Sequence, residues 1–199
     1  MRRKFIALLV VAVGGCGWFG RQASSDDGKD APKKPSEAEM EKMMEMLGTP
    51  GEPHKWLASF EGAWDVASKT YGADGKAEES KGSATFKMIL GGRWQEQVYN
   101  GSYKGKPFEG RGLTGYDNGK KEFVNYWLDG MSTSASVALG QCSDDHKVLT
   151  MSGEWEMPGM KMPFRMVQTV KSDKEMVFRM VGLMGGQELP MVELTYTRK

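Results

Sequence analysis

Between about Trp56 and Arg198, short stretches of alternating apolar and polar residues follow one another along the chain. Alternation with a period of two is typical of a β-strand that buries one face. Residues suited to tight turns separate the stretches, as in Asp117-Asn118-Gly119 and Pro158-Gly159. These joints are too short for crossover helices, so the pattern favours antiparallel hairpins. We predict ten strands, over residues 63–71, 82–90, 93–99, 108–116, 122–128, 133–140, 147–156, 161–171, 175–183 and 189–197.

Ten antiparallel strands in sequence order, with no helices between them, close most easily into an up-and-down β-barrel. We therefore expect an all-β fold, with residues 53–199 forming one barrel domain. A domain of about 145 residues buries roughly 70% of the surface of its unfolded chain, which is enough for one hydrophobic core.

One short helix is expected before the barrel, over residues 36–48. Ser36 and Glu39 have the spacing of a capping box, and Gly48 and Pro50 end the helical pattern. Four apolar side chains at i, i+3, i+4 and i+7 form one stripe: Met40, Met43, Met44 and Leu47. The stripe either packs on the domain or serves as an adaptable lid or partner-binding face.

The first fifteen residues predict a signal peptide. A basic end precedes nine apolar residues from Phe5 to Val13, a run too short to span a bilayer. The next residues, Val13-Gly14-Gly15-Cys16, resemble the lipobox of bacterial lipoproteins. The resemblance implies lipidation at Cys16, and two or more acyl chains would anchor the protein to a membrane. The alternative is an ordinary secretory signal. In both cases we expect the protein to leave the cytoplasm, and with the lipid anchor we expect it in the cell envelope, on the periplasmic or outer face.

Between the signal peptide and the helix, residues 16–35 are polar and rich in Gly, Ser and Asp. A segment of this kind buries too little apolar surface to fold by itself. We expect a disordered tether between the lipidated Cys and the folded domain.

The charges of the chain nearly balance, with 27 Lys and Arg against 26 Asp and Glu. This balance gives no field that attracts nucleic acid, so we expect no nucleic-acid partner. Two His and two Cys are too few for a zinc finger, a three-His metal site or a disulfide framework. If Cys16 is lipidated, Cys142 has no partner, and we expect a free, partly buried thiol there.

The sequence contains no G-x-S-x-G elbow, no H-E-x-x-H motif and no C-x-x-C motif. Gly110 to Gly115 fits the string G-x-G-x-x-G, but it lies within a predicted strand with no helix after it, so it does not indicate nucleotide binding. We therefore expect a protein that is not an enzyme and that needs no cofactor. The alternative is an enzyme that uses carboxylates inside the barrel, drawn from Glu96, Asp129 and Glu193.

Aromatic residues occur on several different predicted strands. The barrel is either filled by its own side chains, as a structural or interaction module, or it holds a cavity for a small hydrophobic ligand. Two arginines stand within apolar strands, and inside a barrel each would need an anion, either Glu193 or Glu96 or the carboxylate of a bound fatty acid. The candidate ligand-binding residues are Trp64, Trp94, Tyr116, Trp127, Arg165 and Arg179.

Four methionines surround the turn at Pro158-Gly159: Met157, Met160, Met162 and Met166. Their thioethers are soft donors with a spacing that is compatible with Cu(I). The alternative is a hairpin whose methionines pack on the barrel.

Several short motifs along the chain resemble known families. Gly62-Ala63-Trp64 resembles the Gly-x-Trp signature of lipocalin-like barrels, whose Trp closes one barrel end. A larger set is similar to the bacterial family called domain of unknown function 1579, from about Thr49 to the C-terminus. This resemblance implies a compact, often exported β-barrel and brings no catalytic residue. The chain departs from the pattern at Met157 to Met166 and at Met184 to Gln187. The segments that carry the resemblance are residues 53–57, 60–66, 82–93, 107–110, 115–118, 126–129 and 194–198.

Overall fold

In the computed structural model, which describes residues 34–72 and 74–199, two short helices precede ten strands. The helices are α1 (Glu37–Gly48) and α2 (Glu52–Ala58). The strands are β1 (Gly62–Tyr71), β2 (Ala77–Ile89), β3 (Trp94–Tyr103), β4 (Lys106–Asp117), β5 (Glu122–Asp129), β6 (Ser136–Cys142), β7 (Val148–Met157), β8 (Met160–Ser172), β9 (Glu175–Met184) and β10 (Gln187–Arg198). The predicted signal peptide over residues 1–15, Cys16 and most of the predicted tether over 16–35 lie outside the described residues.

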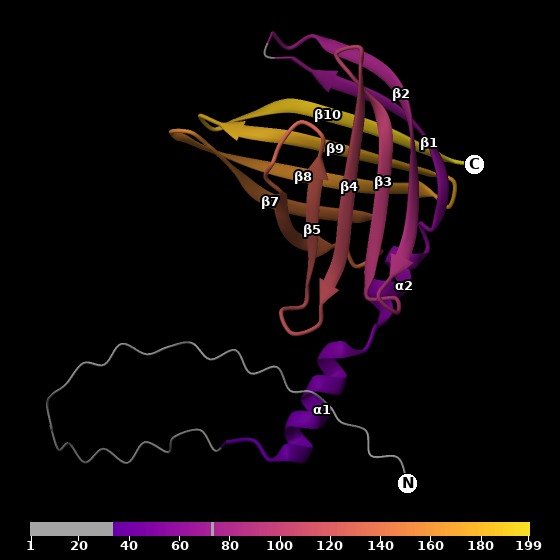
Figure 1. Ribbon diagram of the computed structural model, residues 1–199, viewed down its shortest axis with the longest axis vertical. Coiled ribbons are helices and arrows are strands. Elements are labelled where there is room, and N and C mark those ends of the chain that lie inside the picture. The colour runs from indigo at the N-terminus through magenta and orange to yellow at the C-terminus, as the bar shows by residue number, and fades with distance from the viewer. Residues whose placement is uncertain (1–33, 73) are drawn as a thin grey trace, which may run out of the picture. The chain divides into compact units, whose positions relative to one another are not determined.

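The ten strands form one closed barrel, in which each strand is antiparallel to both neighbours (Figure 1). Strand order follows the chain, and β1 pairs with β10 to close the sheet. The predicted all-β, up-and-down barrel is confirmed, and every predicted strand has its counterpart. In Figure 1 β2 to β4 stand upright and β8 to β10 run across them, so the two walls of the barrel cross at a steep angle.

The two ends of the barrel differ. The closed end carries the β2–β3, β4–β5, β6–β7 and β8–β9 turns; there α2 contacts β2, β3 and β4, and Leu57 and Phe60 are buried against the barrel. Trp56 Nε1 donates to the carbonyl of His146 at 2.8 Å, and Gln95 Nε2 donates to the carbonyl of Leu57 at 2.6 Å. The open end carries the β1–β2, β3–β4, β5–β6, β7–β8 and β9–β10 turns.

The hydrophobic core forms two groups of buried side chains. One surrounds Trp64, Phe86 and Tyr196, and the other surrounds Phe123, Leu149 and Phe164. Trp56 of α2 and Phe178 of β9 pack against both groups. Trp56 therefore joins the two walls of the barrel where they meet the plugging helix.

The sequence pattern does not predict α2. A helix of seven residues is about two turns long, too short for a 3.6-residue period to become visible. Its start is set locally, since Pro53 lies in the first turn and the backbone N–H of Gly51 donates to His54 Nδ1 at 3.0 Å. So short a helix is stable because its apolar side chains pack in the barrel core.

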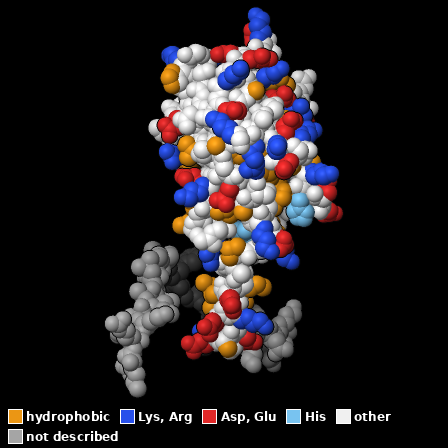
Figure 2. Space-filling model, turned by 90° about the vertical axis from the view of Figure 1, so that its right-hand side faces the viewer, with side chains coloured by type: hydrophobic (Ala, Val, Ile, Leu, Met, Phe, Trp, Pro, Cys, Tyr) orange, Lys and Arg blue, Asp and Glu red, His pale blue; other side chains and the backbone are white. Residues whose placement is uncertain are grey.

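Helix α1 begins where the capping box predicts. The Ser36 hydroxyl accepts from the Glu39 N–H, and the Glu39 carboxylate accepts from the Ser36 N–H. None of its residues is buried, and its Met-rich stripe lies exposed (Figure 2). The Asn118 side chain, in the β4–β5 turn, donates to three carbonyls where α1 ends, those of Met46, Leu47 and Thr49. Neither α1 nor α2 is long and apolar enough to cross a membrane.

Candidate functional site

Alternation along each strand decides which side chains face the inside of the barrel, here called the lumen. Trp64, Val66 and Ser68 of β1 are buried while their neighbours are exposed, so they face inward. Residues opposite one another in a ladder share a face, and the register carries this assignment around the barrel. Several inward-facing apolar side chains are only partly buried, among them Phe108, Trp127, Trp155, Phe178, Met180 and Leu194. We call these six residues the lumen site.

Trp127 lies over the glycines of β4. A side chain at Gly110 would collide with its indole ring, and one at Gly112 would touch both this ring and Gln97. The indole Nε1 donates to the Asp129 carboxylate at 3.0 Å, which sets the orientation of the ring. These glycines therefore make room for an inward-facing tryptophan, which explains the G-x-G-x-x-G string without a nucleotide.

Polar groups inside the barrel are mostly uncharged. Gln97 Nε2 donates to the Tyr196 hydroxyl at 3.0 Å, and Asn125 Nδ2 donates to Thr114 Oγ1 at 2.9 Å. Burial raises the pKa of Tyr196 above its ordinary value, so this hydroxyl stays neutral. The lumen thus combines partly exposed aromatic surface with amide and hydroxyl groups.

The surface is hollowed at the open end. One hollow lies between the β1–β2 and β3–β4 turns and is lined in part by Thr70, Tyr103 and Lys104. Another lies at the β7–β8 turn and is lined in part by Met157 and Met160. The closed end is covered by α2, so access to the lumen is from the open end.

Trp64 and Tyr116 face inward, but both lie at the closed end. Trp64 is 1% exposed, its Nε1 donates to the carbonyl of Phe60 at 2.9 Å, and the guanidinium of Arg198 lies 4.3 Å from its ring centre. The ring of Tyr116 packs edge-on against Phe123 at 5.0 Å. These two residues lie at the closed end and are not part of the lumen site.

Trp94, Arg165 and Arg179 lie on the outer face of the barrel, and this corrects the sequence analysis. Trp94 packs over Gly115 and against Tyr126, with ring centres 6.0 Å apart. The two arginines form ion pairs with acidic residues of β10, Arg165 with Glu188 and Arg179 with Glu193, the latter at 2.5 Å. Each lies one position away from an inward-facing residue, and an offset of one residue places a side chain on the opposite face of a strand.

The three carboxylates considered for an enzyme do not come together. Glu96 lies on the outer face, 3.5 Å from Arg111, and Glu193 lies outside with Arg179. Only Asp129 of the three faces the lumen, where it binds Trp127.

Cys142 is free and partly buried, as expected. Burial, and next the charge of Asp145, raise the pKa of its thiol, which lowers the thiolate fraction that a nucleophile needs.

Comparisons with known proteins show the family and the fold. A family model described as "Protein of unknown function (DUF1579)" matches residues 49–198. The crystal structure of Rv2717c from M. tuberculosis is similar with a TM-score of 0.58 and 11% identity, over 76% of this chain and 99% of that one. The S-type phycobiliprotein lyase CPES from Guillardia theta is similar with a TM-score of 0.53 and 8% identity, over 74% and 92%. At these identities the likeness shows the fold alone. No curated protein matches the chain.

Proposed function

The chain belongs to the family of proteins of unknown function DUF1579, and we propose that it binds a small hydrophobic molecule in the lumen of its barrel. The lumen site carries this proposal, because its six apolar side chains face inward and remain partly exposed in a barrel whose other end is plugged. A ligand there would remove apolar surface from water, which stabilises a complex by about 25 cal/mol per Å². A fully packed barrel would leave no such surface.

The charges around the lumen favour an uncharged ligand. Arg165 and Arg179 lie outside, so neither meets a carboxylate in the lumen. The charged group beside Trp127 is the Asp129 carboxylate, which would repel an anion. The amide groups of Gln97 and Asn125 and the hydroxyl groups of Tyr196 and Thr114 suit an alcohol or a carbonyl. A long-chain alcohol should therefore bind at least as tightly as the fatty acid of equal length.

Trp127→Ala should weaken the binding of a fluorescent long-chain alcohol roughly ten- to hundredfold, because burial of a large apolar side chain contributes about 1.5–3 kcal/mol. The affinity is measured by fluorescence titration of the purified protein. Trp94→Ala is the matched control. Trp94 packs over Gly115 of β4 on the outer face, as Trp127 packs over Gly110 of β4 on the inner face. It should leave the affinity unchanged, as should Arg179→Met.

Two results would refute binding in the lumen. One is the absence of saturable binding at tens of micromolar probe, which would support a barrel filled by its own side chains. The other is an equal loss of affinity in Trp94→Ala and Trp127→Ala, which would move the site to the outer face.

We also propose that the protein is exported and held at a membrane by acyl chains on Cys16. The support is the basic end, the short apolar run and the lipobox-like residues before Cys16. Lipid anchoring would place the barrel in the cell envelope, where a hydrophobic ligand from a nearby membrane could reach its open end.

Cys16→Ser should move the protein from the membrane fraction to the soluble fraction, because no acyl chain can attach to the serine. Fractionation of cells that express the full chain, followed by immunoblotting, measures the distribution. Cys142→Ser is the matched control and should stay at the membrane. Retention of Cys16→Ser at the membrane would exclude this anchor.

A further inference from the structure

Five methionines from four neighbouring strands lie toward the open end of the barrel, and we call them the thioether cluster: Met157, Met160, Met162, Met184 and Met191. Met157 and Met160 are opposite one another across the β7–β8 turn. Met160 and Met184 are 45% and 46% exposed, so an ion from solution can reach them. The sequence pattern contains only the three members on β7 and β8, because β9 and β10 contribute the others.

Two sulfur atoms of the cluster lie close to the position that a side chain at Gly182 would occupy. A methyl group at this glycine would lie 3.3 Å from Met191 Sδ and 3.5 Å from Met162 Sδ. Met191 comes from β10, where the ladder with β9 shifts between Pro190 and Val192. Met162 comes from β8, on the other side of β9. The missing side chain at Gly182 therefore leaves space that two thioethers from different strands share.

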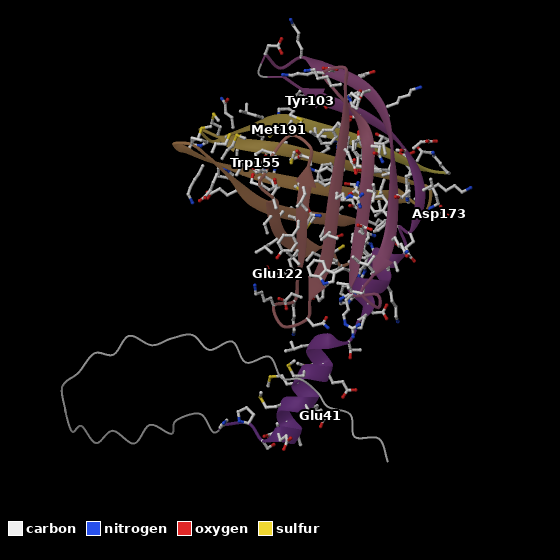
Figure 3. All side chains as sticks on the ribbon, in the orientation of Figure 1. Glu41, Tyr103, Glu122, Trp155, Asp173 and Met191 are labelled. Atoms are coloured by element: carbon white, nitrogen blue, oxygen red, sulfur yellow. The ribbon has the colours of Figure 1, made fainter. Side chains whose placement is uncertain are left out.

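A third methionine and an aromatic ring lie beside this pair. Met184 is two residues beyond Gly182 on β9, so it projects on the same face. Trp155 is opposite Met162 across the β7–β8 ladder. Figure 3 labels Trp155 of β7 and Met191 of β10, the two outer strands of this group of four. The methionine side chain has three rotatable bonds, so small rotations bring several sulfurs to one ion.

Thioethers are neutral, soft donors, and they favour soft metal ions such as Cu(I) over harder ones. Zinc and harder ions prefer imidazole, thiolate and carboxylate ligands. Among the described residues no group of three or more His, Cys, Asp or Glu could hold a metal ion. His54 and His146 lie at the closed end, in α2 and the β6–β7 turn. The cluster is thus suited to a soft monovalent ion.

We propose that Met162 and Met191, with Met184 as the third ligand, bind one Cu(I) ion over Gly182. Met166, which the sequence spacing groups with these residues, is buried in the core and takes no part. The copper ligands are the sulfur atoms of Met162 and Met191 and do not include Trp127, although Trp155 of the lumen site is opposite Met162. Leucine fills the same volume without the donor atom, so it separates coordination from packing.

The test is a competition between the full-length protein and a chromophoric Cu(I) chelator, under anaerobic and reducing conditions. The wild type should bind one Cu(I) per chain, counted by native mass spectrometry. The double variant Met162→Leu/Met191→Leu should bind at least about tenfold more weakly. The matched control Met43→Leu/Met44→Leu changes two exposed methionines of α1 and should bind as the wild type does.

Circular dichroism checks the fold of both double variants, and if the first does not fold, the single variants Met162→Leu and Met191→Leu replace it. X-ray absorption of the copper-loaded wild type should show sulfur neighbours only. The proposal is overturned if the wild type binds no more tightly than Met162→Leu/Met191→Leu. Equal weakening in the α1 control, or a copper spectrum with only nitrogen and oxygen neighbours, would overturn it as well.

Discussion

Trp64→Ala should lower the free energy of unfolding by about 3–5 kcal/mol, the range for removing a large aromatic side chain from a packed core. Trp64 is 1% exposed and packs edge-on against Phe86, with ring centres 6.3 Å apart. Its Nε1 also donates a hydrogen bond to the carbonyl of Phe60, which lies in the segment between α2 and β1. The substitution therefore removes core packing and one contact of the closed end together.

Urea denaturation, followed by far-ultraviolet circular dichroism, measures this loss of stability. Trp94→Ala on the outer face removes the same side chain from a half-buried position and should cost much less. A change below about 1 kcal/mol for Trp64→Ala would contradict the closed-end role of Trp64.

Arg198→Met should lower the free energy of unfolding by about 2–4 kcal/mol, since hydrogen bonds from charged groups contribute about 1.5–3 kcal/mol each. Three nitrogens of this guanidinium donate to backbone carbonyls: Nη1 to Glu61 at 2.6 Å, Nη2 to Ser59 at 2.6 Å and Nε to Asp173 at 2.9 Å. Its face also lies over Trp64, a cation–π contact. Arg198 thus joins the end of β10 to the segment between α2 and β1 and to the β8–β9 turn.

Arg179→Met is the matched control for Arg198→Met, because it replaces an arginine of the neighbouring strand. Its ion pair with Glu193 is on the outer face and the arginine side chain is 64% exposed, so the loss should stay below about 1 kcal/mol. Thermal and urea unfolding of both variants measure the difference. An equal loss of unfolding free energy in the two variants would show that Arg198 contributes no more to stability than an exposed surface arginine.

These two predictions and the binding experiments concern opposite ends of the molecule. Large stability effects are expected at the closed end, where Trp64, Arg198 and α2 pack together. Substitutions at the open end, such as Trp127→Ala and Met191→Leu, change partly exposed side chains and should mainly alter binding.

Features that depend on neighbouring residues could be predicted from the sequence. The capping box of α1 spans three residues, and each hairpin turn follows from a few residues such as Asp117-Asn118-Gly119. Strand alternation is local as well. Because every link in this barrel is a hairpin between consecutive strands, local signals were sufficient for the strand number and the fold class.

The candidate site could be predicted only in part, because it depends on which face each residue occupies. In Tyr126-Trp127-Leu128 all three residues are apolar, so alternation does not say which one faces inward. The pairing of Trp127 with Gly112 in the β4–β5 ladder shows that Trp127 is the residue that faces inward, and Tyr126 and Leu128 are exposed. The arginines of β8 and β9 were misplaced for the same reason, since one residue of offset exchanges the two faces of a strand.

The sequence by itself determined the strands, the turns, the capped helix and thereby the barrel, because each follows from forces that act within a few residues of the chain. Only the tertiary structure decided that α2 plugs one end, that Trp127 faces the lumen, and that Met162 and Met191 both lie near Gly182. These features join residues that are far apart in sequence. Their positions follow from ladder register and packing around the closed barrel, which no local pattern encodes.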